Sequence, residues 1–391
     1  MPIIIADSRN PGDIAIPDNT TIYEFNPWEM GSWDGTTYAF FPLQYIGTNM
    51  SNGNVIDTGR CVTGYDNIGY VYGTSSTLFN QIVLQFNTTV SLPHILENAI
   101  QDALNHFGQT NNGKSFHASP WMTIPLTRRI TDIASWKNPF VGIHPETNPN
   151  VNAAELTLVD GGEDGENIPL HPVIQPYREV DVIFAIDSSA DTTYFWPNGT
   201  SLVATYERSL SALQNRTNFP AIPDQNTFVN LGLNTRPTFF GCNSTNGTLA
   251  GSTRPPPLIV YLPNAPYSFN SNVSTYDLSY SDADRDSIIT NGYNVATRGN
   301  SSTEMWPTCV GCAILSRSFE RTGTAIPAVC NTCMTDYCWN GQVNSTTPAN
   351  YDPTLMVPAA AAAAKSAASD LVPRIGMAVV AAAIAVVALM V

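Results

Sequence analysis

Charged side chains are scarce in this chain. Only 13% of its 391 residues are Asp, Glu, Lys or Arg, well below the roughly 25% typical of soluble domains. Positive charge is scarcest, because 17 Lys and Arg stand against 32 Asp and Glu and the net charge is −15. A surface of this sign repels phosphate polymers at long range, which argues against nucleic acid as a partner. With 43% hydrophobic residues, the chain still has the composition of a folded protein with a core.

Several catalytic signatures are also missing. The chain contains no Gly-x-Ser-x-Gly nucleophile elbow, the usual mark of a serine hydrolase. Its glycine pair Gly161-Gly162 is followed by acidic residues, which would repel a phosphate. No two histidines have a metal-ligand spacing, so we interpret each as a surface or packing residue and predict neither a metal nor a cofactor. The five histidines are His94, His106, His117, His144 and His171.

Asn-x-Ser/Thr sequons are frequent, in contrast to charge. Ten such sites in a chain poor in charge fit a surface solvated by glycans, and glycosylation requires passage through a secretory pathway. We therefore predict a secreted or cell-surface glycoprotein. The predicted acceptors are Asn19, Asn49, Asn87, Asn198, Asn215, Asn243, Asn246, Asn272, Asn300 and Asn344.

The C-terminal tail resembles a signal for a glycosylphosphatidylinositol (GPI) anchor. An Ala- and Pro-rich stem over residues 346–365 precedes four small residues, a short polar segment and an apolar run that reaches Val391. We predict attachment of the anchor at Ser366, with Ala367, Ala368 and Ser369 as competing sites, and removal of the rest of 366–391. The alternative is a transmembrane helix, although the run is at the lower length limit for a bilayer span.

The N-terminal sequence does not provide the entry signal that a GPI-anchored protein requires. The stretch from Met1 into Ala6 has neither a basic segment nor a cleavable apolar segment, so it is no secretory signal peptide. An anchored protein needs an entry signal, and we expect that a stretch of chain upstream of Met1 is missing.

Seven cysteines give an odd count, which leaves one thiol without a partner in an oxidising compartment. A cysteine in the missing upstream stretch would explain it. Two Cys-x-x-Cys pairs have the spacing of a zinc ribbon, but the secretory compartment favours disulfides over zinc. The candidates for disulfide bonds are Cys61, Cys242, Cys309, Cys312, Cys330, Cys333 and Cys338.

Apolar runs bounded by turn residues predict buried strands between long loops. Two further stretches carry apolar residues at intervals of three and four, which predicts amphipathic helices over residues 92–107 and 201–213. Strands and helices together predict an α/β layer fold. The predicted strands cover residues 82–86, 156–159, 180–186 and 258–262.

One segment carries a pattern suited to catalysis. The apolar strand at residues 156–159 delivers Asp160 to the turn Gly161-Gly162, where its carboxylate could project from the strand end as a general base. Asp-Gly-Gly is also common turn chemistry, and by itself the pattern favours a plain turn.

Seven segments, in order along the chain, resemble the fungal lysophospholipase (phospholipase B) family, which is related to the cytosolic group-four phospholipases. The resemblance covers residues 1–345. These segments are Tyr23–Glu29, Gly73–Asn80, Val159–Pro169, Asp181–Asp187, Thr227–Leu233, Pro237–Cys242 and Tyr337–Gly341.

The resemblance implies a three-layer α/β catalytic domain of the patatin and cytosolic phospholipase type, N-terminally incomplete here. It also implies hydrolysis of fatty-acyl esters of phospholipids and lysophospholipids by a Ser–Asp dyad, through an acyl-enzyme and without metal. Asp160 stands at the position of the catalytic aspartate. The family's nucleophilic serine, its glycine-rich oxyanion loop and the associated arginine belong upstream of Met1. Ser75 and Ser76 lie in a structural segment of the family, and we do not assign either as nucleophile.

Two alternatives remain open. The chain could be a GPI-anchored surface glycoprotein that has kept the scaffold and lost catalysis, or a metal-binding module built on the cluster Cys309–Cys338. The first predicts a cooperative unfolding transition for the 391-residue chain, and the second predicts bound zinc.

Overall fold

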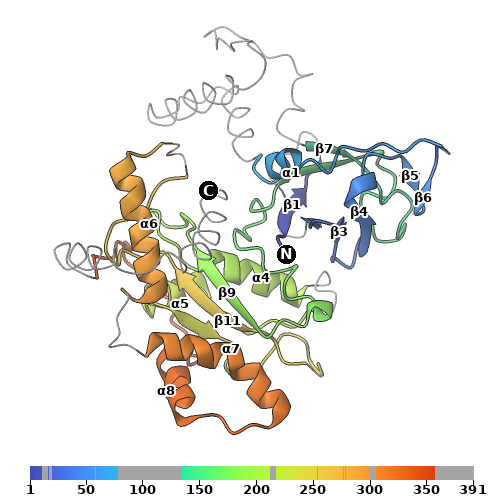
Figure 1. The fold of residues 1–391 in the computed structure, drawn as a ribbon. Helices are drawn as coiled ribbons and strands as arrows, with labels where there is room; N and C mark the ends of the chain where they lie inside the picture. The colour runs from blue at the N-terminus through green and yellow to red at the C-terminus, as the bar shows by residue number, and fades with distance from the viewer. Residues whose placement is uncertain are drawn as a thin grey trace, which may run out of the picture. The chain divides into compact units, whose positions relative to one another are not determined.

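The computed structural model describes residues 1–10, 16, 20–57, 59–77, 134–211, 217–252, 254–275, 277, 279–299 and 305–356. They form two compact units, and Figure 1 shows the elements of each. Unit 1 comprises residues 1–180, 201–219 and 248–254, and unit 2 comprises residues 181–200, 220–247 and 255–391. The predicted strand 82–86, the predicted helix 92–107 and the tail with Ser366 lie outside the described residues.

Unit 1 is built on a six-stranded sheet in the order β4-β3-β2-β1-β8-β7, in which all five pairings are antiparallel. A short helix, α1 (Ile68–Thr74), contacts β1 and β8. A core cluster that includes Ala6, Tyr23, Trp136, Leu158 and Val71 of α1 lies on this face. The strands are β1 (Ile4–Ser8), β2 (Ile22–Phe25), β3 (Glu29–Ser32), β4 (Ala39–Pro42), β7 (Ala134–Lys137) and β8 (Glu155–Asp160).

Smaller elements complete unit 1. Helix α4 (Thr200–Leu210) belongs to it from Ser201 onward, and it follows the prediction of a helix over residues 201–213 as far as the structure describes that stretch. Two-residue strands β5 (Met50–Ser51) and β6 (Asn54–Val55) form a separate hairpin. The 3₁₀ turns η1 and η3 cover Leu43–Tyr45 and Pro176–Arg178.

Unit 2 has a three-stranded mixed sheet. β9 (Val182–Asp187) pairs in parallel with β11 (Leu258–Pro263), and β10 (Thr238–Phe240) pairs antiparallel with β11. All six residues of β11 are buried, as expected for a central strand covered on both faces. The predicted strands at 156–159, 180–186 and 258–262 correspond to β8, β9 and β11. Together with the helices, these sheets confirm the α/β class.

The helices of unit 2 have identifiable ends. In α6 (Asp282–Thr297), the hydroxyl oxygen of Ser281 accepts a hydrogen bond from the Asp284 amide, and two aspartates in the first turn complement the helix dipole. α7 (Trp306–Thr322) is followed by Gly323, whose φ of 64° gives the left-handed conformation that ends a helix. α5 and α8 cover Gln225–Asn230 and Ala328–Tyr337. No helix of the described stretches is long and apolar enough to span a bilayer.

Three disulfides stabilise unit 2, which confirms the prediction of disulfides. Cys309–Cys333 and Cys312–Cys330 join α7 to α8, and Cys242–Cys338 joins the chain after β10 to the end of α8. The four sulfurs of the two Cys-x-x-Cys pairs bond to one another across the helices, so the zinc-module alternative is wrong. Cys61 is exposed and forms no disulfide within the described part of the chain.

Candidate active site

Asp160 is the last residue of β8 and lies opposite Ala6 of β1. Directly opposed residues of an antiparallel pair point to the same face. The side chain of Asp160 therefore shares a face with Ala6 and Leu158, which belong to the core beside α1. Asp160 itself is half-buried. The strand thus brings a carboxylate out of an apolar core at the point where the sheet ends.

The turn after Asp160 holds this carboxylate through the backbone. The amide of Gly162 donates a 2.9 Å hydrogen bond to Oδ1 of Asp160, and the amide of Glu163 donates to its carbonyl oxygen at 3.3 Å. Neither glycine position has room for a side chain. A Cβ at Gly161 would lie 2.6 Å from the carbonyl oxygen of Ile5, and one at Gly162 would lie 2.5 Å from Oδ1 of Asn167. Glycine at 161 is thus required by close approach of the Ile5 backbone, whereas the atom close to Gly162 is the end of the Asn167 side chain.

The segment after α1 fixes the other side of the turn. The backbone amide of Asp160 donates to the hydroxyl oxygen of Thr77 at 2.8 Å, and the Ser75 hydroxyl donates to the carbonyl oxygen of Ile5 at 2.6 Å. Ser76 donates its hydroxyl to the carbonyl oxygen of Tyr72. Ser75 and Ser76 thus each donate a hydrogen bond to a backbone carbonyl oxygen.

A buried charged cluster lies on the opposite face of β1. Arg208 of α4 is its centre: Nη2 lies 2.8 Å from Oδ2 of Asp34, while Nη1 and Nε lie 3.9 and 3.8 Å from carboxylate oxygens of Asp164 and Glu166. Asp7 of β1, which is fully buried, accepts a 3.3 Å hydrogen bond from the Asp164 amide. Arg208 therefore contacts two carboxylates of the acidic loop that begins at Asp160, and Arg9 pairs with a third, Glu163, at 3.2 Å.

Helix α4 presents a polar stripe to this loop. Ser201, Thr205 and Arg208 are spaced at i, i+4 and i+7, which places them on one helix face. The Ser201 hydroxyl oxygen accepts from the Ile168 amide, and the Thr205 hydroxyl donates to Oε2 of Glu166, both at 2.8 Å. All three side chains are buried. The buried face of α4 thus supplies hydrogen-bonding partners for both backbone and side-chain groups of the loop.

Burial and mutual repulsion shift the pKa values of these carboxyl groups. Burial and the neighbouring Asp164 raise the pKa of Glu166 to about 8, and burial likewise raises the pKa values of Asp7 and Asp164. Burial would also raise the pKa of Asp34, but Arg208 and His171 outweigh it, and the pKa is lowered. One carboxylate of the cluster is thus kept ionised beside Arg208, while others hold protons more firmly than free carboxyls.

The other predicted residues lie apart from Asp160. His171 is buried with Nε2 3.1 Å from Asp34, as a packing histidine would be, and His144 is exposed. Among the sequons, Asn49, Asn243 and Asn246 are exposed. Three further acceptors, Asn198, Asn272 and Asn344, are half-buried. The predicted residues outside the described stretches are His94, His106, His117, Asn19, Asn87, Asn215 and Asn300.

Sequence reasoning missed the Arg208 cluster. One signal was available, because Arg208 falls on the inward face of the predicted helix in a chain with few basic residues. No group of His, Cys, Asp and Glu in the described stretches is arranged to hold a metal ion.

Comparisons with known proteins agree on one family. The family model of the lysophospholipase catalytic domain matches residues 1–344. The chain is 54% identical to lysophospholipase 1 of Aspergillus fumigatus over 96% of this chain. It is 52% identical to a lysophospholipase of Penicillium chrysogenum over the full length of this chain. These alignments cover 55% and 59% of the two relatives, so the chain spans little more than half their length.

Among solved structures, human GIVD cytosolic phospholipase A2 matches with a TM-score of 0.42 and 13% identity. This match covers 77% of the chain and 36% of that protein. The extent of the family match and the identity to the fungal relatives lead to one conclusion: this chain belongs to the lysophospholipase catalytic domain family.

Proposed function

We propose that this chain supplies the general base of a lysophospholipase or phospholipase B, and that Asp160 is this base. The observation that carries the proposal is the position of Asp160 at the end of β8, in a turn whose backbone is hydrogen-bonded on both sides. A base has to be held within reach of the proton that it takes. The names of the fungal relatives supply the reaction class, and nothing in them favours an inactive glycoprotein.

In the proposed reaction, the carboxylate of Asp160 accepts the proton of a serine hydroxyl, and the serine oxygen attacks the carbonyl carbon of the fatty-acyl ester. The glycerophospho alcohol leaves with a proton, and water then hydrolyses the acyl-enzyme to release the fatty acid. Backbone amides of a glycine-rich loop would stabilise the oxyanion. We place the serine and this loop on residues outside 1–391, because the relatives are nearly twice as long as this chain.

The test is release of fatty acid from lysophosphatidylcholine by the 391-residue chain and by a form lengthened to match the relatives, each with Asp160→Asn. We expect activity in the longer form and a loss on the order of 10⁴ in kcat on substitution of the base, as for a dyad or triad carboxylate. Asp286→Asn, which changes an exposed aspartate of α6, is the control. Full activity of the Asp160→Asn protein would exclude Asp160 as base, and activity of the 391-residue chain would place the serine within it.

We further propose that the protein is a glycoprotein held at the cell surface by a GPI anchor at Ser366. Three disulfides and the exposed acceptors Asn49, Asn243 and Asn246 support an oxidising, extracellular setting. The protein should lose mass on treatment with an N-glycosidase and should leave the membrane on treatment with a phosphatidylinositol-specific phospholipase. Retention of membrane binding after that treatment would favour a transmembrane helix instead.

A further inference from the structure

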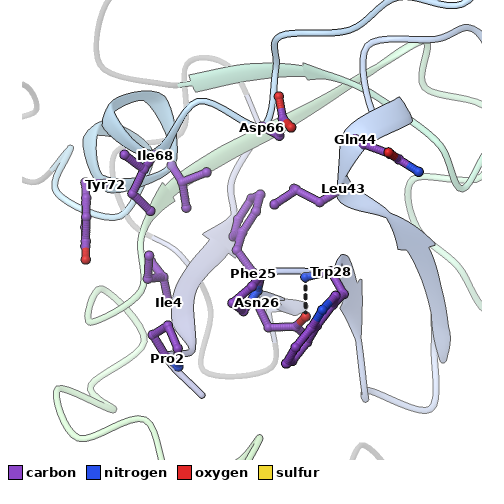
Figure 2. A pocket seen from close by; sticks show the side chains of 12 residues that line it. Pro2, Ile4, Phe25, Asn26, Trp28, Leu43, Gln44, Asp66, Ile68 and Tyr72 are labelled. Atoms are coloured by element: carbon purple, nitrogen blue, oxygen red, sulfur yellow. Dashed lines mark hydrogen bonds between the residues drawn. The ribbon is translucent and has the colours of Figure 1, made fainter.

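Unit 1 contains a cavity of about 450 Å³ on the α1 side of its sheet. Figure 2 shows Phe25 between two walls, with Ile68 and Tyr72 of α1 on one side and Leu43 and Trp28 on the other. The volume is in the range of small-molecule sites, roughly 300–1,000 Å³. The cavity is therefore large enough for a ligand.

The interior of the cavity is apolar, and its rim carries large exposed apolar and aromatic side chains. Ile4, Phe25, Leu43 and Val71 line it and are each less than a tenth exposed. At the opening, by contrast, Trp28 is 67% exposed, Ile68 59% and Tyr72 45%. Large apolar side chains left in water beside an apolar cavity are typical of a site that binds an apolar ligand or another polypeptide segment.

The polar side chains that line the cavity do not offer a partner for a charged group of a ligand at its buried end. The side-chain oxygen of Asn26 accepts hydrogen bonds from the amides of Trp28 and Glu29, and its nitrogen donates to Glu24. Gln44 and Asp66 are exposed to solvent. A ligand with a charge at its buried end would thus lose hydration without compensation, whereas a hydrocarbon chain would not.

The cavity lies close to Asp160. Ile4, which lines the cavity, is two residues before Ala6 on β1, and Ala6 pairs with Asp160. Residues two apart on a strand share a face and are separated by about 7 Å, so Ile4 and Asp160 point to the same face.

Helix α1 gives a second connection. Val71 and Tyr72 line the cavity, and Thr77, five residues after Tyr72, accepts the hydrogen bond from the amide of Asp160. The same helix thus forms one wall of the cavity and leads into the turn that holds the carboxylate.

We propose that this cavity binds the fatty-acyl chain of a lysophospholipid whose ester group lies at Asp160. The choice of ligand rests on the proposed function, because a lysophospholipase has to place a single hydrocarbon chain next to its base. The cavity is suited to this role because its lining is apolar, its volume is sufficient and it lies on the same face of the sheet as Asp160. A polypeptide segment of a longer form is the competing occupant.

Binding can be measured without turnover through the fluorescence of Trp28. The probe is lysophosphatidylcholine with a dibrominated acyl chain, used below its micelle concentration, because bromine quenches tryptophans that it contacts. We expect quenching of the 391-residue chain that is reduced in Trp28→Phe, and no quenching by brominated lipid when unlabelled lysophosphatidylcholine is in excess. Glycerophosphocholine, which has no acyl chain, should not compete. Equal quenching in Trp28→Phe would overturn the proposal.

A rim substitution tests the cavity itself. Ile68→Asp places a charge at the opening and should weaken binding at least about tenfold, since an apolar contact is lost and a carboxylate has to be desolvated. Ile68 is the first residue of α1, where aspartate favours a helix, so the fold is retained. Ile314→Asp, which changes a comparably exposed isoleucine of α7, is the matched control. Equal affinity of both variants would contradict the assignment.

The length of the lipid's acyl chain gives an independent measure of binding in the cavity. Affinity should rise about fourfold for each methylene added to a short acyl chain, and this increment should shrink in Ile68→Asp. Because quenching and affinity are measured without turnover, a failure of the proposed base leaves the cavity assignment intact, and the reverse also holds. If a longer form matched to the relatives loses the Trp28 quenching, the cavity is a polypeptide contact and the proposal is wrong.

Discussion

The backbone amide of Asp160 donates a 2.8 Å hydrogen bond to the side-chain oxygen of Thr77, 83 positions earlier in the chain. This bond connects the end of β8 to the segment that follows α1, and it fixes the backbone of the residue proposed as base. Thr77 is nearly fully buried, so water cannot take its place at low cost.

Thr77→Val tests this contact. Valine has the shape of threonine without the oxygen, so the Asp160 amide would lose its partner, and we expect a loss of about 1–3 kcal/mol in the free energy of unfolding. Because the turn would also lose its orientation, kcat on lysophosphatidylcholine should fall while KM changes little. Thr332→Val, at an exposed position of α8, is the control for the substitution itself. A variant with unchanged kcat would show that Thr77 does not position Asp160.

Arg208→Met should destabilise the protein strongly. It leaves Asp34, Asp164 and Glu166 buried without their guanidinium, and removal of one partner of a buried ion pair costs about 3–5 kcal/mol. Urea unfolding of the purified chain gives this difference. Arg208→Lys keeps the charge and should recover part of the loss, because one ammonium cannot reach all three carboxylates as the guanidinium does.

The comparison for Arg208 is Arg321→Met. Arg321 forms an ion pair with Asp181 in unit 2, with half of its side chain exposed, and exposed pairs contribute about 0–1 kcal/mol. If both substitutions cost the same, the buried cluster does not stabilise the acidic loop.

Stability should fall as pH rises through the neutral range. The pKa of Glu166 is raised from 4.5 to about 8 in the folded protein by burial and by Asp164. The folded state therefore binds more protons than the unfolded state between these values, so the contribution of Glu166 is fully present below pH 4.5 and is lost as pH rises toward 8. Asp7, whose pKa is also raised, acts in the same direction.

Glu166→Gln should flatten this dependence. The variant cannot take up the charge, so its stability relative to the wild type should increase from pH 4.5 to pH 8, measured by chemical unfolding at several pH values. Glu207→Gln, at an exposed position of the same helix α4 that contacts Glu166, should keep the pH profile of the wild type. A parallel profile for Glu166→Gln would mean that Glu166 is already ionised in the folded state.

Local patterns in the sequence predict three of the strands, β8, β9 and β11, and the turn after β8. The apolar run that ends at Asp160 gives β8, and the following glycines indicate its turn, because strand and turn propensities depend on residues that are neighbours in the sequence. The cluster around Arg208 could not be predicted in the same way. Its members come from β1, the region of Asp34, the acidic loop and α4, and only the tertiary fold brings them together. The pairing of the cysteines depends on the fold for the same reason.

The two disulfides between α7 and α8 have a consequence for the segment that joins these helices, residues 323–327. Cys309–Cys333 encloses Cys312–Cys330, and both enclose this segment, which is exposed. An endoprotease that cuts there separates the peptide chain into two pieces that stay covalently joined by all three disulfides. Such a nicked molecule would keep its mass under non-reducing conditions and would release a C-terminal fragment only when the third bridge, Cys242–Cys338, is reduced as well.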